Sequence, residues 1–257
     1  MTSLLSLLRA FLIALQFLTC LPVALRQAPS AEEIGRSALF YPVVGLVLAA
    51  LLAPLLRLAG HLGATPFLWA ALALSLWVIL TGGLHLDGLA DTVDAWMGGR
   101  GQRERTLALM RDPHCGPMAV IALFLVLSLK LAALEVLVRA GQGPLIALPL
   151  ILGRQALVLL FLSTPYARSQ GLGLALSREL PRNPATLLLL LTTLGLLGAF
   201  PLLGALTTLL SLGVFLGLRR ALLRRLGGTT GDTAGALVEL VETSTLLLCA
   251  GALGYTL

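Results

Sequence analysis

From residue 185 to residue 218 the chain carries no charged side chain. Similar apolar runs recur along the sequence, and about twenty such residues are what a helix needs to cross the hydrocarbon core of a bilayer. Inside a membrane each spanning helix satisfies its own backbone N–H and C=O groups, whereas a transmembrane barrel would show alternating segments of about ten residues. The sequence therefore predicts an all-α fold, a polytopic transmembrane helix bundle.

The composition supports a membrane protein. Of the 257 residues, 12% are charged and 58% are hydrophobic, and a soluble domain carries roughly twice that charged fraction. We expect six to eight spans in one membrane domain, residues 1–257. Pro201 and Gly204 are the only break within 185–218, and the first run is interrupted by Arg9 and Gln16 and can lie in the membrane interface instead. The apolar runs give approximate spans at 4–21, 38–59, 66–86, 118–139, 145–163, 185–200, 202–218 and 237–257.

The arginines are concentrated in alternate connections between these runs. If all eight runs cross, the connections on one side hold two, four, three and four arginines, which are 13 of the 18 basic residues. Short basic loops stay in the cytoplasm, so we expect this face, which also carries most of the acidic residues, to be cytoplasmic and to hold the active site. The four connections are 22–37, 87–117, 164–184 and 219–236.

The excess of basic over acidic residues does not indicate nucleic-acid binding. The formal net charge is +6, but the arginines are spread over short loops and aromatic residues make up only 5% of the chain. We therefore expect no nucleic-acid partner, and we attribute the charge to membrane orientation and to phosphate-rich small molecules. The three cysteines, Cys20, Cys115 and Cys249, form no CxxC pair and predict neither a disulfide framework nor a metal site.

Three aspartates follow the third apolar run. Asp87, Asp91 and Asp94 are spaced four and three residues apart, so on a helix all three project from one face. Like charges this close repel one another, and a divalent cation bound between carboxylates removes that cost. A solvated helix start, where acids favour the helix dipole, explains one or two acids but not a stripe two turns long. We therefore expect Mg²⁺, with Mn²⁺ as an alternative, at these three residues.

The next stretch, RGQRERTLALMRDPHCGPM, is rich in arginine. Taken singly, each arginine is explained by membrane orientation, but carboxylates, metal and arginines together are what phosphoryl transfer requires. We expect Arg100, Arg105 and Arg111 to bind substrate phosphates. We expect Asp94 or Asp112 to act as the general base.

A third stretch, GGTTGDTAGALVELVE at 227–242, opens a helix. Its glycines and helix N-terminus can offer amides to an anion, or it can be an ordinary N-cap with a turn. Elsewhere, Lys130, Glu135 and Arg154 lie inside or near spans. Ionisable groups there indicate either a function or a structural Arg–Glu pair between neighbouring helices.

Three of these segments resemble one family in the correct order. GGLHLDGLADTVDA, LMRDPHCG and GDTAGALVELVE, together with FLTCLPV and LFYPVVGLVL near the N-terminus, are similar to the cobalamin synthase family over nearly the whole chain. The resemblance implies an adenosylcobinamide-GDP ribazoletransferase of the bacterial cytoplasmic (inner) membrane, a multi-pass protein. Such an enzyme joins adenosylcobinamide-GDP to α-ribazole or its 5′-phosphate with Mg²⁺ and releases GMP, in the last step of cobalamin nucleotide-loop assembly.

By position, the resemblance assigns the acidic motif to the three aspartates, and the basic-Asp-x-x-x-Gly segment to Arg111, Asp112 and Gly116. It implies that Gly116, Asp232 and Glu239 bind substrate. Pro113 stands where the family commonly has Ser, and Pro117 where Thr or Ser is expected, so this loop has its own local shape. A homo-oligomer, or association with other cobalamin-assembly enzymes, is a further expectation.

Two other functions would also explain parts of this sequence. A CDP-alcohol phosphotransferase also uses aspartates and a divalent metal at the membrane edge, but its D-G-x-x-A-R motif ends in Ala-Arg where this chain has Asp91 and Thr92. A small-molecule transporter would place charges at mid-membrane, often in inverted repeats. Here the acids gather at one interface, and no repeat is evident.

Overall fold

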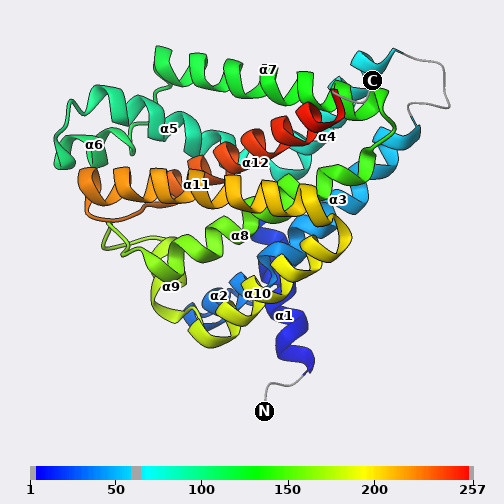
Figure 1. Ribbon diagram of the computed structural model, residues 1–257. Coiled ribbons are helices and arrows are strands. Elements are labelled where there is room, and N and C mark those ends of the chain that lie inside the picture. The colour runs from blue at the N-terminus through cyan, green and yellow to red at the C-terminus, as the bar shows by residue number, and fades with distance from the viewer. Residues whose placement is uncertain (1–3, 59–64, 255–257) are drawn as a thin grey trace.

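The computed structural model describes residues 4–58 and 65–254, and within these ranges every regular element is a helix (Figure 1). This confirms the predicted all-α fold. The elements in chain order are α1 (Leu4–Leu18), α2 (Ala31–Ser37), η1 (Ala38–Phe40), α3 (Tyr41–Leu58), α4 (Pro66–Thr81), α5 (Leu84–Gly98), α6 (Arg103–Leu109), α7 (Pro117–Arg139), η2 (Gly143–Ile146), α8 (Ala147–Ser163), α9 (Leu172–Glu179), α10 (Arg182–Ala199), α11 (Pro201–Leu226) and α12 (Gly231–Gly254).

Five helical segments are long and apolar enough to cross a membrane, and seven are if each of two bent helix pairs counts as one span. A polytopic bundle is confirmed, and this count overlaps the six to eight spans expected. Helix α1 has 15 residues, fewer than a typical span of about 20, so 4–21 does not count as a crossing by length. The five segments are Ala31–Leu58, Pro117–Arg139, Gly143–Ser163, Pro201–Leu226 and Gly231–Leu253.

The predicted span 66–86 is wrong at its end, because the chain turns sharply inside it. Gly82 and Gly83 have φ angles of 60° and 67°, a left-handed conformation that glycine adopts without a steric cost, and α5 leaves α4 at 85°. The three aspartates therefore lie together on a separate helix, α5, as their spacing predicted. Hydropathy continues unbroken through this point, so it did not reveal the turn.

Helix α12 lies in the middle of the bundle and packs against α5, α7, α8 and α11. Its approach to α5 depends on two glycines, since a Cβ atom at Gly88 would lie 2.7 Å from the carbonyl oxygen of Asp232, and one at Gly235 would lie 3.3 Å from the Cα of Gly88. This close crossing brings the aspartate face of α5 beside the start of α12.

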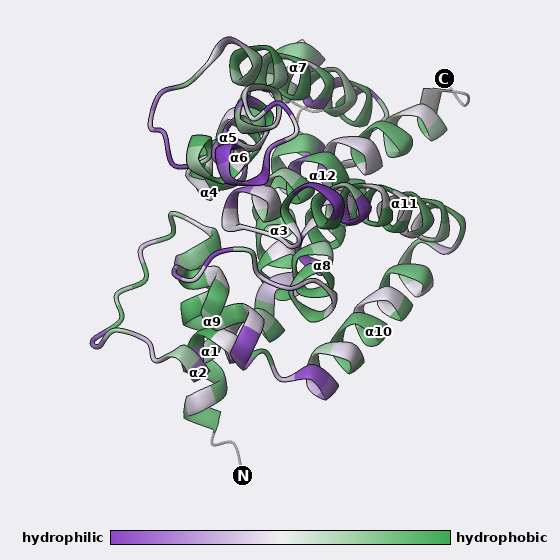
Figure 2. Ribbon diagram, turned by 90° about the vertical axis from the view of Figure 1, so that its left-hand side faces the viewer, coloured by the Kyte–Doolittle hydropathy of each residue, from purple (hydrophilic) through white to green (hydrophobic). Residues whose placement is uncertain are grey.

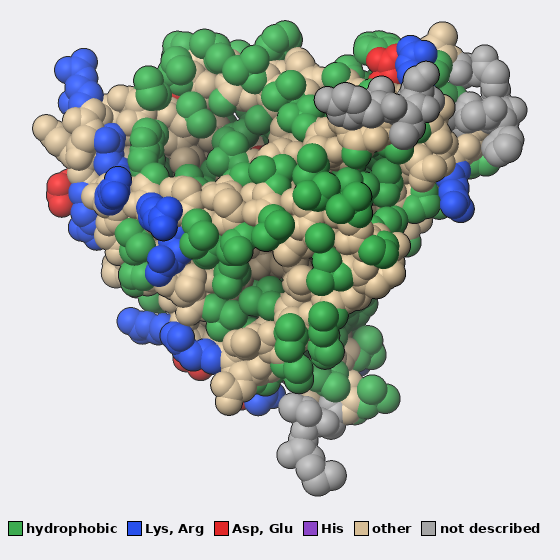
Figure 3. All heavy atoms as spheres, in the orientation of Figure 1, with side chains coloured by type: hydrophobic (Ala, Val, Ile, Leu, Met, Phe, Trp, Pro, Cys, Tyr) green, Lys and Arg blue, Asp and Glu red, His purple; other side chains and the backbone are tan. Residues whose placement is uncertain are grey.

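One end of the bundle is polar and the long helices are apolar. Figure 3 shows Lys and Arg side chains gathered along the edge where Figure 1 places α6, and hydrophobic side chains across the helices. Figure 2, viewed onto that end, shows hydrophilic segments around α6 and between α11 and α12. Exposed side chains such as Phe124 and Leu209, at 70% and 66%, fit helices that face lipid. That this polar end is the cytoplasmic face stays a prediction.

This orientation is testable with single cysteines in the connections before and after α7. Gln102, at the start of α6, and Gln142, just after α7, are both exposed. In a background in which the exposed Cys20 and Cys115 are replaced by serine, Gln102→Cys should resist an impermeant thiol reagent in intact cells, and Gln142→Cys should react. Permeabilised cells should label both. The reverse pattern in intact cells would overturn the cytoplasmic placement of the site.

Candidate active site

A short backbone pairing brings together two loops at the polar end. The N–H of Thr229 donates to the Pro165 carbonyl at 2.9 Å, and the N–H of Ala167 donates to the Thr229 carbonyl at 2.8 Å. As a result, Arg168 donates from Nη2 to Oδ2 of Asp232 at 2.6 Å. Sequence reasoning missed Arg168, because the only signal was its membership of the arginine-bearing connection 164–184.

Two threonines cap the N-terminus of α12. The N–H of Thr233 donates to Oγ1 of Thr230 at 3.2 Å, and the N–H of Thr230 donates to Oγ1 of Thr233 at 2.8 Å. This reciprocal capping satisfies backbone donors that have no partner inside the helix. The N-cap interpretation of the GGTT stretch is therefore confirmed. Asp232 lies in the first turn, where the helix dipole favours a carboxylate.

Helix α5 supplies two further carboxylates. Asp87 is exposed, and Asp91 is partly buried. Asp91 lies within electrostatic reach of Asp87, Asp94 and Asp232, and of the cation Arg168. The structure thus gathers Asp232, which is distant in sequence, with the predicted aspartates. These four aspartates outnumber Arg168, so the cluster that they form carries an excess of negative charge.

The third aspartate of the stripe has a different role. Asp94 accepts the N–H of Gly116 at 2.5 Å and the N–H of Ala119 at 2.9 Å, so it caps the start of α7. A Cβ atom at Gly116 would lie 2.8 Å from both carboxylate oxygens of Asp94, so this contact depends on glycine. The structure therefore brings Asp94 and Gly116 together as a helix cap. Metal binding or catalysis by Asp94, and substrate binding by Gly116, stay predictions.

The aspartates form no closed metal cage. Within residues 4–58 and 65–254, no three His, Cys, Asp or Glu side chains are grouped so that they could hold a metal ion. Mg²⁺, however, is usually bound by one or two carboxylates together with waters and substrate phosphates. Asp87 and Asp91 fit that kind of site, because they lie within electrostatic reach of each other on one helix face. Among the residues that the structure describes, none forms a hydrogen bond or ion pair with their carboxylate oxygens.

The predicted arginines differ in their contacts. Arg100 precedes α6 and Arg105 lies within it; both are exposed, and no contact among the described residues joins them to the carboxylates. Arg111 lies close enough to Tyr166 for its charge to act on the phenol; burial is the largest effect there and raises the pKa of Tyr166. The neighbouring Asp112 is exposed, and its Oδ1 accepts the backbone N–H of His114 at 3.1 Å and contacts the His114 ring at 2.5 Å. These hydrogen bonds lower the pKa of Asp112, so its carboxylate is ionised at neutral pH.

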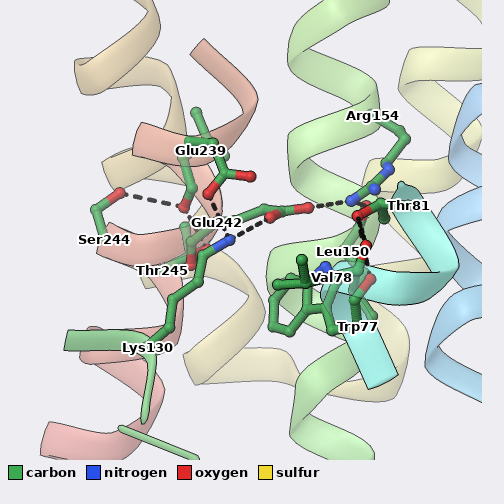
Figure 4. A network of polar contacts seen from close by, with 11 residues as sticks. Trp77, Val78, Thr81, Lys130, Leu150, Arg154, Glu239, Glu242, Ser244 and Thr245 are labelled. Atoms are coloured by element: carbon green, nitrogen blue, oxygen red, sulfur yellow. Dashed lines mark hydrogen bonds and ion pairs between the residues drawn. The ribbon is translucent and has the colours of Figure 1, made fainter. Parts of the chain in front are cut away.

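Glu239 lies in the core of the bundle, where it is 4% exposed (Figure 4). Lys130 donates to Glu239 at 2.7 Å and to Glu242 at 2.6 Å, and Arg154 donates to the other oxygen of Glu242. A structural Arg–Glu pair between helices is present, but its acid is Glu242. The expectation was wrong for Glu135, which pairs instead with Arg139 on its own helix. Substrate binding by Glu239 stays a prediction, and Lys130 is its partner in this structure.

A cavity of about 290 Å³ opens beside the carboxylates. Arg168, Asp87 and Asp232 line it on the polar side. The remaining wall is largely apolar and is drawn from α1, α3, α5, α8, α9 and α12 and from the loop that carries Tyr166. Its larger side chains are Phe17, Leu18, Tyr41, Leu84, His85, Leu157, Phe161, Tyr166, Leu172 and Leu176.

The arrangement can be compared with known proteins. A family model described as cobalamin-5-phosphate synthase matches residues 10–250. The chain is 57% identical to an adenosylcobinamide-GDP ribazoletransferase of Pseudomonas entomophila, over 92% of this chain and 96% of that protein. Proteins of the same name from Stutzerimonas stutzeri and Pseudomonas aeruginosa are 55% and 52% identical, over 92% and 95% of this chain and 95% and 98% of theirs. No solved structure matches the chain.

Proposed function

Because this chain belongs to the cobalamin-5-phosphate synthase family, we propose that its carboxylate cluster and cavity form the active site of an adenosylcobinamide-GDP ribazoletransferase. Such an enzyme transfers a substituted phosphate group. Its substrates are adenosylcobinamide-GDP and α-ribazole or α-ribazole 5′-phosphate. The observation that carries the assignment is the meeting of Asp87, Asp91 and Asp232 with Arg168 at the arginine-rich end of the bundle.

The metal belongs to this proposal. Asp87 and Asp91 would hold Mg²⁺, or Mn²⁺, with the diphosphate and water completing the coordination. When bound, the ion supplies positive charge that neutralises the diphosphate and the departing phosphate. Asp94 supports the site indirectly, because its two hydrogen bonds hold the N-terminus of α7 in place.

The protein's own groups bind and orient the reactants. A sugar hydroxyl of the acceptor attacks the phosphorus attached to cobinamide, a new P–O bond forms, and the diphosphate P–O bond breaks as GMP leaves with its electron pair. Arg100, Arg105 and Arg111 bind phosphate oxygens. The hydroxyl proton passes to a carboxylate, and Asp112 suits this role better than Asp94. Both contacts of Asp112 fall on Oδ1, whereas both oxygens of Asp94 accept backbone amides.

Family membership decides against the CDP-alcohol phosphotransferase and transporter alternatives. We place the enzyme in the bacterial inner membrane, with the arginine-rich end in the cytoplasm. Association with a second copy or with other cobalamin-assembly enzymes is a further part of the proposal.

The proposal is tested with the purified protein in detergent. Adenosylcobinamide-GDP, α-ribazole and Mg²⁺ together should give adenosylcobalamin and GMP in equal amounts. Supplying α-ribazole 5′-phosphate should give the 5′-phosphate of the product. Chelation of the metal should stop both reactions, and added Mg²⁺ should restore them. Release of GMP at the same rate without an acceptor would show a hydrolase instead.

A further inference from the structure

We infer that the cavity is the binding site of the acceptor nucleoside, and that the guanosine nucleotide of the other substrate binds outside it, against the exposed arginines. The inference rests on the proposed function, because it assigns the two substrates of that reaction to two parts of one site. Size is the first argument. At about 290 Å³ the cavity is near the lower limit of roughly 300–1,000 Å³ for small-molecule sites, which suits one nucleoside and excludes a corrinoid.

The aromatic rings of the wall are the second argument. Phe17 and Tyr41 stack with centroids 6.2 Å apart, and Phe161 and Tyr166 lie 6.5 Å apart at an interplanar angle of 36°. All four residues line the cavity. The base of α-ribazole is a dimethylated benzimidazole, a flat aromatic system with an apolar edge, and such walls suit it. Guanine has a polar edge that would lose its hydrogen bonds with water among these side chains.

The charges at the mouth are the third argument. Asp87, Asp232 and Arg168 border the same cavity. A nucleoside whose base lies among the rings therefore has its sugar at the carboxylates, where the hydroxyl reacts. The diphosphate of the other substrate would meet this mouth through the metal proposed at Asp87 and Asp91. Its guanosine then lies outside the cavity, towards the exposed arginines of α6 and the residues before it, which offer an anion a better surface than the apolar wall.

The test places a larger side chain at the rim of the cavity, so that the acceptor nucleoside can no longer enter freely. Leu172 lines the cavity on α9 and is 55% exposed, so the fold should tolerate Leu172→Trp. We expect the KM for α-ribazole to rise at least about tenfold, and the KM for adenosylcobinamide-GDP to stay within about twofold. Leu190→Trp is the matched control, because Leu190 is also 55% exposed but lies on α10, outside this cavity. It should change neither constant.

A second variant and a binding measurement make the result independent of that one side chain. Phe161→Ala should weaken equilibrium binding of α-ribazole alone, measured by calorimetry, and leave the binding of GMP unchanged. If either variant raised the KM for adenosylcobinamide-GDP as much as that for α-ribazole, or left the α-ribazole constants unchanged, the inference would be wrong. Failure of the proposed function looks different: the unaltered protein would then make no cobalamin from the two substrates.

Discussion

Replacing Asp87 or Asp91 by asparagine is expected to lower turnover by more than about 100-fold, since even the loss of an outer partner of a metal ligand costs 10- to 100-fold. Asparagine keeps the shape of the side chain and removes one negative charge. Because ligand charge sets affinity for a hard cation, any remaining activity should require more Mg²⁺. Steady-state rates measured over a series of Mg²⁺ concentrations separate the two effects.

Asp94→Asn gives a contrast within the same helix. It removes the charge that caps α7, where Asp94 accepts two amide hydrogens, so it should lower thermal stability. Its Mg²⁺ requirement should rise less than that of Asp91→Asn. Glu32→Gln, at an exposed pair with Arg36, should change neither property. If both Asp87→Asn and Asp91→Asn kept normal activity and an unchanged Mg²⁺ requirement, these aspartates would bind no metal and would only be solvated residues of α5.

Glu242→Gln is expected to lower the free energy of unfolding by about 3–5 kcal/mol, the cost of breaking a buried ion pair. Glu242 is 1% exposed in its side chain and is the partner of both Lys130 and Arg154. Without its charge, two buried cations share the single carboxylate of Glu239. The measurement is thermal or denaturant unfolding of the purified protein in one detergent.

Two comparisons make this prediction specific. Glu135→Gln breaks an i,i+4 pair with the exposed Arg139 and should cost at most about 1 kcal/mol. The double variant Lys130→Met, Glu239→Gln removes one charge of each sign and keeps the Arg154–Glu242 pair, so it should be more stable than Lys130→Met alone. If Glu242→Gln were as stable as Glu135→Gln, the buried network would contribute nothing to the fold.

The sequence was most informative where the signal is local. Apolar runs predicted helices because each spanning helix must satisfy its own backbone, and the spacing of the aspartates of α5 fixed their common face. The turn at Gly82 and Gly83 was missed, because hydropathy averages over many residues and the turn depends on two backbone angles.

The site was harder to predict, because its partners are distant in the chain. Arg168 reaches Asp232 only through the pairing of residues 165–167 with Thr229. The capping of α7 by Asp94 depends on the fold of the loop between α5 and α7, and no local pattern shows it. Sequence spacing placed three aspartates on one face correctly, but it could not show that one of them faces backbone amides.

The buried charge network also bears on how the protein is made. Lys130 and Arg154 lie on α7 and α8, and both of their acidic partners lie on α12, which is synthesised after them. A lysine or arginine at the centre of a helix adds about 2.5–3.5 kcal/mol to the cost of membrane insertion. We infer that the nascent bundle holds two uncompensated cations in the bilayer until α12 arrives. A chain truncated before α12 would therefore be a poorly inserted substrate for membrane quality control.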